Sequence, residues 1–198
     1  MAPMLPALIG FAVVMYITPG PNNVMVASSA ANYGIRATMP HMLGIALGFA
    51  LMLTLVSAGL GSVLLAWPLL LPVMRWIGIA WLLWLGWKIA TMPPPRTGER
   101  RRLLGFIGAA GFQWINPKAW LIAAGAASTF LLPDRALPPQ LLRICLVFLG
   151  CAMPCLLVWA LIGSGSGRLL RSPGRLRAFN LAMAALLVLS VLPVLFED

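Results

Sequence analysis

The chain has 198 residues, of which 61% are hydrophobic and only 9% are charged. Soluble domains carry roughly a quarter of charged residues, so this composition excludes an ordinary soluble domain and predicts a protein that crosses the membrane several times. The net charge of +10 does not indicate nucleic-acid binding, because the cations fall in short connections between apolar runs and not along one soluble face.

Six apolar runs are each long enough to cross a bilayer as a helix. We expect spans at residues 4–30, 40–66, 70–91, 104–131, 140–165 and 177–196. Turn-forming residues separate them, such as Asn32-Tyr33-Gly34 and Pro93-Pro94-Pro95. The predicted fold is therefore all-α and integral to the membrane, with six transmembrane helices. The amino end has no cation ahead of its apolar core and two prolines within it, so we expect residues 1–31 to remain as the first span and not to be cleaved as a signal peptide.

The first run is interrupted by the sequence Thr18-Pro19-Gly20-Pro21-Asn22-Asn23. Interior prolines remove amide donors and clash with the preceding turn, which predicts a broken helix. The freed carbonyls, the Thr18 hydroxyl and the amide oxygens of Asn22 and Asn23 suit an ammonium group, and Gly20 allows close backbone approach. A double-proline kink that only shapes helix packing is the alternative.

The fourth run is interrupted by Asn116-Pro117-Lys118. Asn116 is a good N-cap and Pro117 suits the first helical position, so a new helix is expected to begin here. Helix N-termini present free amide donors and a positive dipole end, and Lys118 adds a full charge, so we expect this break to bind a carboxylate. An ammonium this deep in a span is costly unless it serves a cavity or a partner. The alternatives are a lysine that snorkels to the interface or one bonded to loose carbonyls.

The longest charged connection divides the chain into two halves of three spans each. We expect a first repeat at residues 1–95, a charged cytoplasmic linker at 96–103 and a second repeat at 104–198. An odd number of spans gives the two halves opposite orientations, so the prediction is two inverted three-helix repeats with helices 1 and 4 broken. Broken helices at matching places are the best sequence pointer to a transporter's substrate site.

The cations decide the expected orientation. Ten lie on the side that holds connections 1–2, 3–4 and 5–6, and three lie on the other side with both termini. The ten are Arg36, Lys88, Arg96, Arg100, Arg101, Arg102, Arg168, Arg171, Arg175 and Arg177, and the three are Arg75, Arg135 and Arg143. Cytoplasmic loops are rich in Lys and Arg, so both termini are predicted to be periplasmic.

Acids are absent from the predicted spans, since Glu99, Asp134, Glu197 and Asp198 all fall in connections or the tail. Without a carboxylate in a span, the usual intramembrane proton relay is missing and a strongly cationic substrate is disfavoured. Lys118 and His41 remain as candidate proton carriers. No nucleophile–base pair, phosphate loop or metal-ligand set is recognisable, so we expect no enzyme activity, no cofactor and no metal.

Several of these residues together resemble a known family. The marks are Thr18–Asn23, Gly34-Ile35-Arg36, Gly44-Ile45-Ala46-Leu47-Gly48, Trp84-Leu85-Gly86-Trp87-Lys88 and Asn116-Pro117-Lys118. The chain resembles, over nearly its whole length, the lysine-exporter/homoserine–threonine-exporter family (LysE/RhtB) of small bacterial amino-acid efflux proteins. The resemblance implies six hydrophobic segments, location in the inner membrane, export of a small amino acid by a transporter and dependence on the proton gradient.

Within that family the chain looks closest to the cysteine/O-acetylserine exporters, on the basis of Trp87–Thr91 and Ser128–Pro133. Many family members carry an aspartate directly after the glycine in span two, whereas this chain has Phe49 after Gly48. The resemblance implies efflux of small neutral amino acids such as cysteine or O-acetylserine, by alternating access around the two breaks. Homoserine, threonine or other neutral amino acids are alternative substrates, and a membrane scaffold or regulatory subunit that transports nothing is the alternative from another class.

The expected partners are a small amino acid and the lipid bilayer, with no nucleic acid. Gly44 and Gly48 form a G-x-x-x-G step that suits close helix packing, which leaves a homodimer open.

Overall fold

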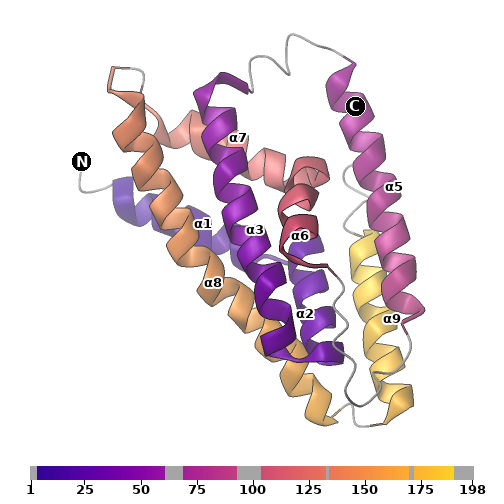
Figure 1. Ribbon diagram of the computed structural model, residues 1–198. Helices are drawn as coiled ribbons and strands as arrows, with labels where there is room; N and C mark the ends of the chain where they lie inside the picture. The colour runs from indigo at the N-terminus through magenta and orange to yellow at the C-terminus, as the bar shows by residue number, and fades with distance from the viewer. Residues whose placement is uncertain (1–3, 61–68, 93–103, 133, 170–171, 190–198) are drawn as a thin grey trace.

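The computed structural model describes residues 4–60, 69–92, 104–132, 134–169 and 172–189, and within them every regular element is helical. Figure 1 shows their arrangement. The helices are α1 (Met4–Ile17), α2 (Pro21–Tyr33), α3 (Ile35–Leu55) with a π turn (Val56–Leu60), α5 (Leu70–Ala90), α6 (Phe106–Phe112) with a 3-10 turn (Gln113–Ile115), α7 (Pro117–Phe130), α8 (Leu137–Leu169) and α9 (Pro173–Leu189).

Each of the six apolar runs contains helix, but several predicted bounds were wrong. The second helix starts at Ile35 and not at residue 40, because Gly34 takes a φ of 81° and so turns the chain from α2 into α3 without a loop. The helix α8 extends past both bounds of the predicted fifth span, and α9 starts at Pro173 instead of residue 177. Residues 61–66 and 190–196 of the predicted spans, and the whole 96–103 linker, lie outside the described residues.

Two helices in the described part of the chain are long and apolar enough to cross a membrane, Ile35–Gly59 and Leu137–Gly165. A third candidate is the bent pair α1 and α2, whose axes differ by 56°. The segments Trp76–Ala90 and Phe106–Ile115 are shorter apolar helices. The helical membrane character is therefore supported, while six spans in two inverted repeats remain a prediction.

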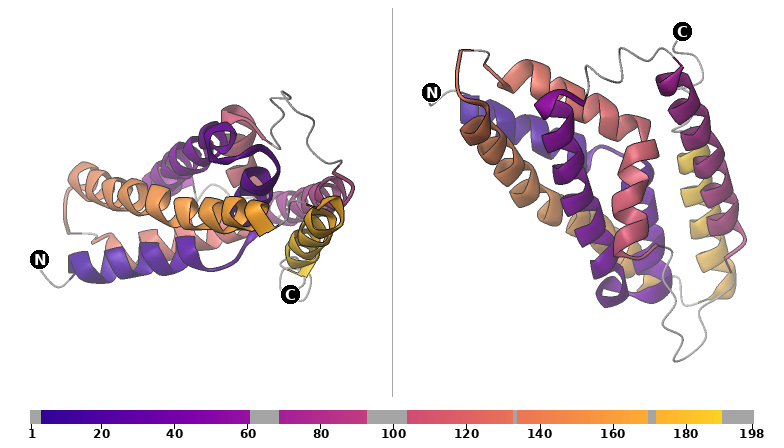
Figure 2. Two further views of the ribbon diagram at one scale, coloured as in Figure 1. Left: turned by 90° about the horizontal axis from the view of Figure 1, so that it is seen from below. Right: turned by 45° about the horizontal axis from the view of Figure 1, so that its top comes forward.

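Both predicted breaks are present. The helix α1 ends at Ile17 and α2 begins at Pro21, and the fourth run is divided at Asn116 between the 3-10 turn and α7. In both cases a proline occupies the first turn of the helix that follows, where its missing amide costs least. In Figure 2, the start of α1 and the end of α7 lie on the same side of the molecule, and both helices run from there toward its middle.

Glycines bring the helices around the breaks into close contact. A Cβ placed on Gly48 of α3 would lie 2.5 Å from the Cα of Ala110 in α6, and one on Gly163 of α8 would lie 2.0 Å from the carbonyl oxygen of Ala27 in α2. Gly44 meets α6 in the same way, with Phe106 as its neighbour. The G-x-x-x-G step is therefore used inside the chain, so its sequence gives no support for a dimer face.

The helix α8 packs against both halves of the first broken span. Phe148 meets the rings of Phe11 and Tyr16 of α1 at centroid distances of 6.3 and 5.9 Å. Further along α8, beyond Pro154, the indole nitrogen of Trp159 donates to the carbonyl oxygen of Ile17 at 3.1 Å. Gly163 then lies against α2, so α8 passes from α1 to α2 across the break.

Helix ends sort into two groups. The turn from α2 to α3, the end of α5, the end of α8 and the start of α9 lie toward the bottom of Figure 1, and the end of α3 and the start of α5 lie toward the top. Many large apolar side chains on the outer faces are exposed, including Leu51 at 56%, Leu121 at 62% and Leu146 at 58%. Such a surface is expected where a protein faces acyl chains.

Candidate functional site

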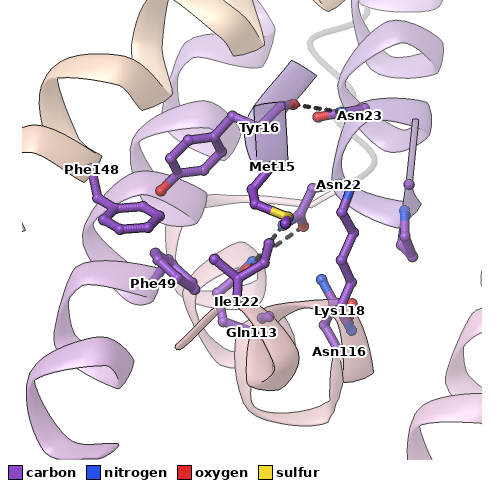
Figure 3. A pocket seen from close by; sticks show the side chains of 13 residues that line it. Met15, Tyr16, Asn22, Asn23, Phe49, Gln113, Asn116, Lys118, Ile122 and Phe148 are labelled. Carbon is purple, nitrogen blue, oxygen red and sulfur yellow. Dashed lines mark hydrogen bonds between the residues drawn. The ribbon is translucent and has the colours of Figure 1, made fainter. Parts of the chain in front are cut away.

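A small cavity lies between the two breaks (Figure 3). Its volume of about 30 Å³ is room for a water molecule or two, and is too small for an amino acid. The lining residues are Met15, Tyr16, Gly20, Pro21, Asn22, Asn23, Phe49, Gln113, Asn116, Lys118, Ala119, Ile122 and Phe148. The two interrupted segments therefore meet around one cavity.

The structure brings the predicted site residues together. Six of them line the cavity: Gly20, Pro21, Asn22, Asn23, Asn116 and Lys118. The other three flank it. Thr18 and Pro19 contribute backbone carbonyls to Lys118, and Pro117 begins α7.

Lys118 connects the two breaks directly. Its Nζ donates to the carbonyl oxygen of Thr18 at 2.8 Å and to that of Pro19 at 3.3 Å. This is the contact with loose carbonyls that the sequence left open as an alternative to carboxylate binding. The side chain is half-buried and runs along Gly20, where a Cβ would lie 3.0 Å from its Cδ.

Side chains also bond carbonyls at the end of α1, including the Thr18 carbonyl that Lys118 contacts. The Asn23 Nδ2 donates to the carbonyl oxygens of Tyr16 and Thr18, both at 2.8 Å. The Thr18 hydroxyl donates back to the carbonyl oxygen of Val14. The Trp159 indole also donates to the carbonyl oxygen of Ile17. These hydrogen bonds fix the end of α1, so tertiary contacts stabilise the break.

The two helix N-termini at the cavity differ in their free donors. Asn116 caps α7 as predicted, since its side chain accepts from the Lys118 amide at 3.2 Å. The amides of Ala119 and Trp120 both reach the Asn116 carbonyl, so the free donors expected at this helix are already used. That expectation was wrong, because the N-cap and the tight first turn consume them.

The free donors lie instead at the start of α2. Its N-cap is Gly20, which has no side chain to cap the helix. The amides of Asn22 and Asn23 find no acceptor within the described residues, and both residues line the cavity. The positive end of the α2 dipole therefore faces the cavity near Lys118.

A reciprocal amide pair joins the broken spans. The Asn22 Nδ2 donates to the Gln113 Oε1 at 2.9 Å, and the Gln113 Nε2 donates to the Asn22 Oδ1 at 3.2 Å and to the Ala109 carbonyl at 2.9 Å. Gln113 is fully buried and was missed in the sequence. The sequence does hold a sign of its role, because Gln113 is the sole amide side chain in the apolar run from Phe106 to Ile115.

Aromatic rings form the opposite wall. The ring centroids of Tyr16 and Phe49 are 6.0 Å apart and those of Phe49 and Phe148 are 5.3 Å apart. Phe49, the residue after Gly48, gives the cavity an apolar surface here. The Tyr16 hydroxyl is buried and has no hydrogen-bond partner among the described residues.

His41 lies elsewhere. It is fully buried in α3, and neither ring nitrogen has a hydrogen-bond partner within the described part of the chain. It is not one of the residues that line the cavity. Of the two candidate proton carriers, only Lys118 is therefore at the cavity.

Comparison with known proteins gives matches along nearly the whole chain. Residues 13–195 match the family model described as LysE type translocator. A cysteine/O-acetylserine efflux protein of Salmonella typhimurium is 32% identical over 189 residues, which cover 95% of this chain and 96% of that protein. The cysteine/O-acetylserine efflux protein of Escherichia coli (strain K12) is 31% identical over 185 residues, which cover 93% of this chain and 94% of that protein. No solved structure matches this chain.

Proposed function

Because the chain belongs to the LysE type translocator family, and is thus a transporter and not an enzyme, we propose that it exports small neutral amino acids of the cysteine and O-acetylserine kind from the bacterial cytoplasm. The names of the similar efflux proteins support this choice of substrate. The proposed location is the inner membrane, which the family and the exposed apolar helices support.

The observation that carries the proposal is the composition of the cavity. Among the residues that the structure describes, Lys118 is the one charged side chain that lines it, and no carboxylate does. A lone cation beside helix ends and amide groups favours a solute with a carboxylate, and the absence of an acid disfavours one with a cationic side chain. A neutral amino acid meets both conditions.

Of the nine predicted residues, we assign five to the two ends of that zwitterion and four to the shape of the site. The carboxylate would pair with Lys118 and with the uncapped amides of Asn22 and Asn23 at the start of α2. The ammonium would take the carbonyl oxygens of Thr18 and Pro19. Gly20 and Pro21 shape the break, and Asn116 with Pro117 fixes the start of α7 and so the position of Lys118.

Alternating access around the two breaks is the proposed mechanism. The small volume of the cavity and the hydrogen bonds between the breaks support a closed conformation, from which the broken helices would move apart to load substrate. We propose six spans in two inverted repeats, with the end of the molecule that holds the starts of α3 and α9 in the cytoplasm. The proton gradient is the proposed energy source, with Lys118 or His41 as the group that takes up the proton.

Transport by purified protein tests the proposal. In proteoliposomes loaded with labelled cysteine or O-acetylserine, the wild type should exchange label for external neutral amino acids. Lys118→Ala should abolish exchange and leave folded protein in the membrane, because it removes the ammonium that is proposed to bind the carboxylate. Lys88→Ala is the matched control, since Lys88 is a half-buried cation over the Trp84 ring, 4.9 Å from its centroid, and does not line the cavity.

The same assay separates the alternatives. Exchange confined to homoserine and threonine would replace the proposed substrates but keep the mechanism. No exchange of any neutral amino acid by the wild type would favour a membrane scaffold, and full exchange by Lys118→Ala would remove the carboxylate role of that lysine.

A further inference from the structure

Lys118 already holds a position suited to the ammonium group of a solute. Its Nζ contacts two backbone carbonyls, those of Thr18 and Pro19, at 2.8 and 3.3 Å. These carbonyls follow the last residue of α1, where unpaired acceptors and the negative end of the helix dipole both favour a cation. A lysine side chain ends in a primary ammonium, which is the group that an α-amino acid carries.

The fit of the lysine against Gly20 is close. A Cβ at Gly20 would lie 3.0 Å from the Lys118 Cδ and 3.2 Å from its Nζ. The backbone of Gly20 is extended, with a φ of 180°, so glycine is needed here for space and not for its backbone angles. The break is therefore shaped to admit a methylene chain that ends in an ammonium.

We propose that the carbonyls of Thr18 and Pro19 form an ammonium subsite, which Lys118 fills in the empty carrier and gives up to the substrate. This inference rests on the proposed function and adds the state of the site before loading. When substrate arrives, its ammonium takes the two carbonyls and the released Nζ of Lys118 pairs with its carboxylate. Movement of the lysine stem also creates the room that the closed cavity lacks.

Charge is conserved through this exchange. The empty site holds the single positive charge of Lys118, and a zwitterionic amino acid adds none. An amine without a carboxylate would displace the lysine and leave its charge unpaired. A carboxylate without an amine would draw Lys118 away and leave the Pro19 carbonyl without its donor and the Thr18 carbonyl with Asn23 alone. The site therefore selects solutes that carry both groups.

The subsite also connects the two broken spans. Lys118 is the second residue of α7, whereas its acceptors lie in the break between α1 and α2. In the empty carrier this contact holds the breaks together, next to the amide pair of Asn22 and Gln113. Substrate binding thus replaces one of the contacts that keep the cavity closed.

Binding of a small amine to the purified full-length protein in lipid nanodiscs tests the subsite, by isothermal titration calorimetry. Ethylammonium should bind Lys118→Ala at least about tenfold more tightly than the wild type, because the variant has no lysine to displace. Tetramethylammonium has the same charge but no N–H donor, and it should bind neither protein. Lys88→Ala should bind ethylammonium as weakly as the wild type.

Lys118→Ser provides a second vacant subsite, which decides the matter if Lys118→Ala does not fold. Gly20→Ala added to either Lys118 variant should remove the ethylammonium binding, because its Cβ would occupy the space of the methylene chain, whereas Gly10→Ala, where a Cβ meets nothing within 4 Å, should not.

Equal ethylammonium affinity in the wild type and the variants would overturn the subsite, as would tight binding of tetramethylammonium. Failure of the proposed function is a separate result. Amine binding by the variants without amino-acid exchange by the wild type would sustain the subsite and reject the transport proposal, and exchange without amine binding would do the reverse.

Discussion

Gln113 lines the cavity and connects the fourth run to the first break through its buried amide. Each amide group of the Asn22–Gln113 pair donates one hydrogen bond to the other, and Gln113 gives a further one to Ala109. At a fully buried position, loss of one partner leaves the other without its hydrogen bonds. The pair is therefore a stabilising contact between the two broken spans.

Replacing one member of the pair should destabilise the closed state. Gln113→Leu should lower the stability of the purified protein by about 1 kcal/mol, because it leaves the half-buried Asn22 amide without its partner. The double variant with Asn22→Leu should recover part of that loss. Thermal unfolding in a fixed detergent measures both, and additive losses in the double variant would mean that the pair contributes nothing.

Residue-scale features were predicted where local chemistry decides them. The cap by Asn116 follows from the residue itself and its proline neighbour, and the cap is present. The partner of Lys118 could not be fixed, because the carbonyls that it meets are about one hundred residues away in sequence. Gln113 and Tyr16 were missed for the same reason, since only the packing of distant helices brings them to the cavity.

At the scale of elements, small residues determine how closely the broken spans approach their neighbours. Gly163 of α8 lies against the Ala27 carbonyl of α2, while Gly150 of the same helix has nothing within 4 Å of its would-be Cβ. The two glycines therefore have different structural roles within one helix. Gly163 allows contact, and Gly150 only lowers helix propensity.

Alanine substitutions at these two positions should change the stability of the protein in opposite directions. Gly163→Ala should destabilise the protein by about 1–3 kcal/mol, because its Cβ would overlap the backbone of α2. Gly150→Ala should stabilise it by up to about 1 kcal/mol through helix propensity alone. Thermal unfolding of the two variants side by side checks the prediction, and a loss at Gly150 or a gain at Gly163 would contradict the packing described here.

The existence of helices and of both breaks was predictable, because apolar runs and prolines act locally. Their ends were less so. The glycine turn at Gly34 let α3 begin directly after α2, and the long α8 passed the apolar limits that hydropathy sets. Tertiary contacts such as Gly48 on Ala110 also decided that the G-x-x-x-G step serves the interior of one chain.

For the whole molecule, the distribution of cations predicts orientation. Arg36 lies at the start of α3 and Arg175 and Arg177 at the start of α9, and both helix starts lie toward the same end of the molecule. Cytoplasmic surfaces collect such cations, so this end should face the cytoplasm. The connection between α7 and α8, which contains Asp134, should then face the periplasm.

Single cysteines at exposed positions check this orientation. In a background where Cys145, Cys151 and Cys155 are replaced by alanine, Asp134→Cys should react with a membrane-impermeant maleimide in intact cells, and Ser172→Cys should react only after the cells are permeabilised. Both native residues are exposed. The reverse pattern would invert the proposed topology, and labelling of both positions from outside would rule out six spans.

The proline in α8 has a mechanical consequence. Pro154 removes one backbone hydrogen bond from α8 between Phe148, which rests on α1, and Gly163, which rests on α2. Trp159, beyond the proline, still holds the carbonyl oxygen of Ile17 at the end of α1. A swing of α1 that carries the leading part of α8 by bending at Pro154 would therefore have to release this one hydrogen bond, while Gly163 stays packed on α2.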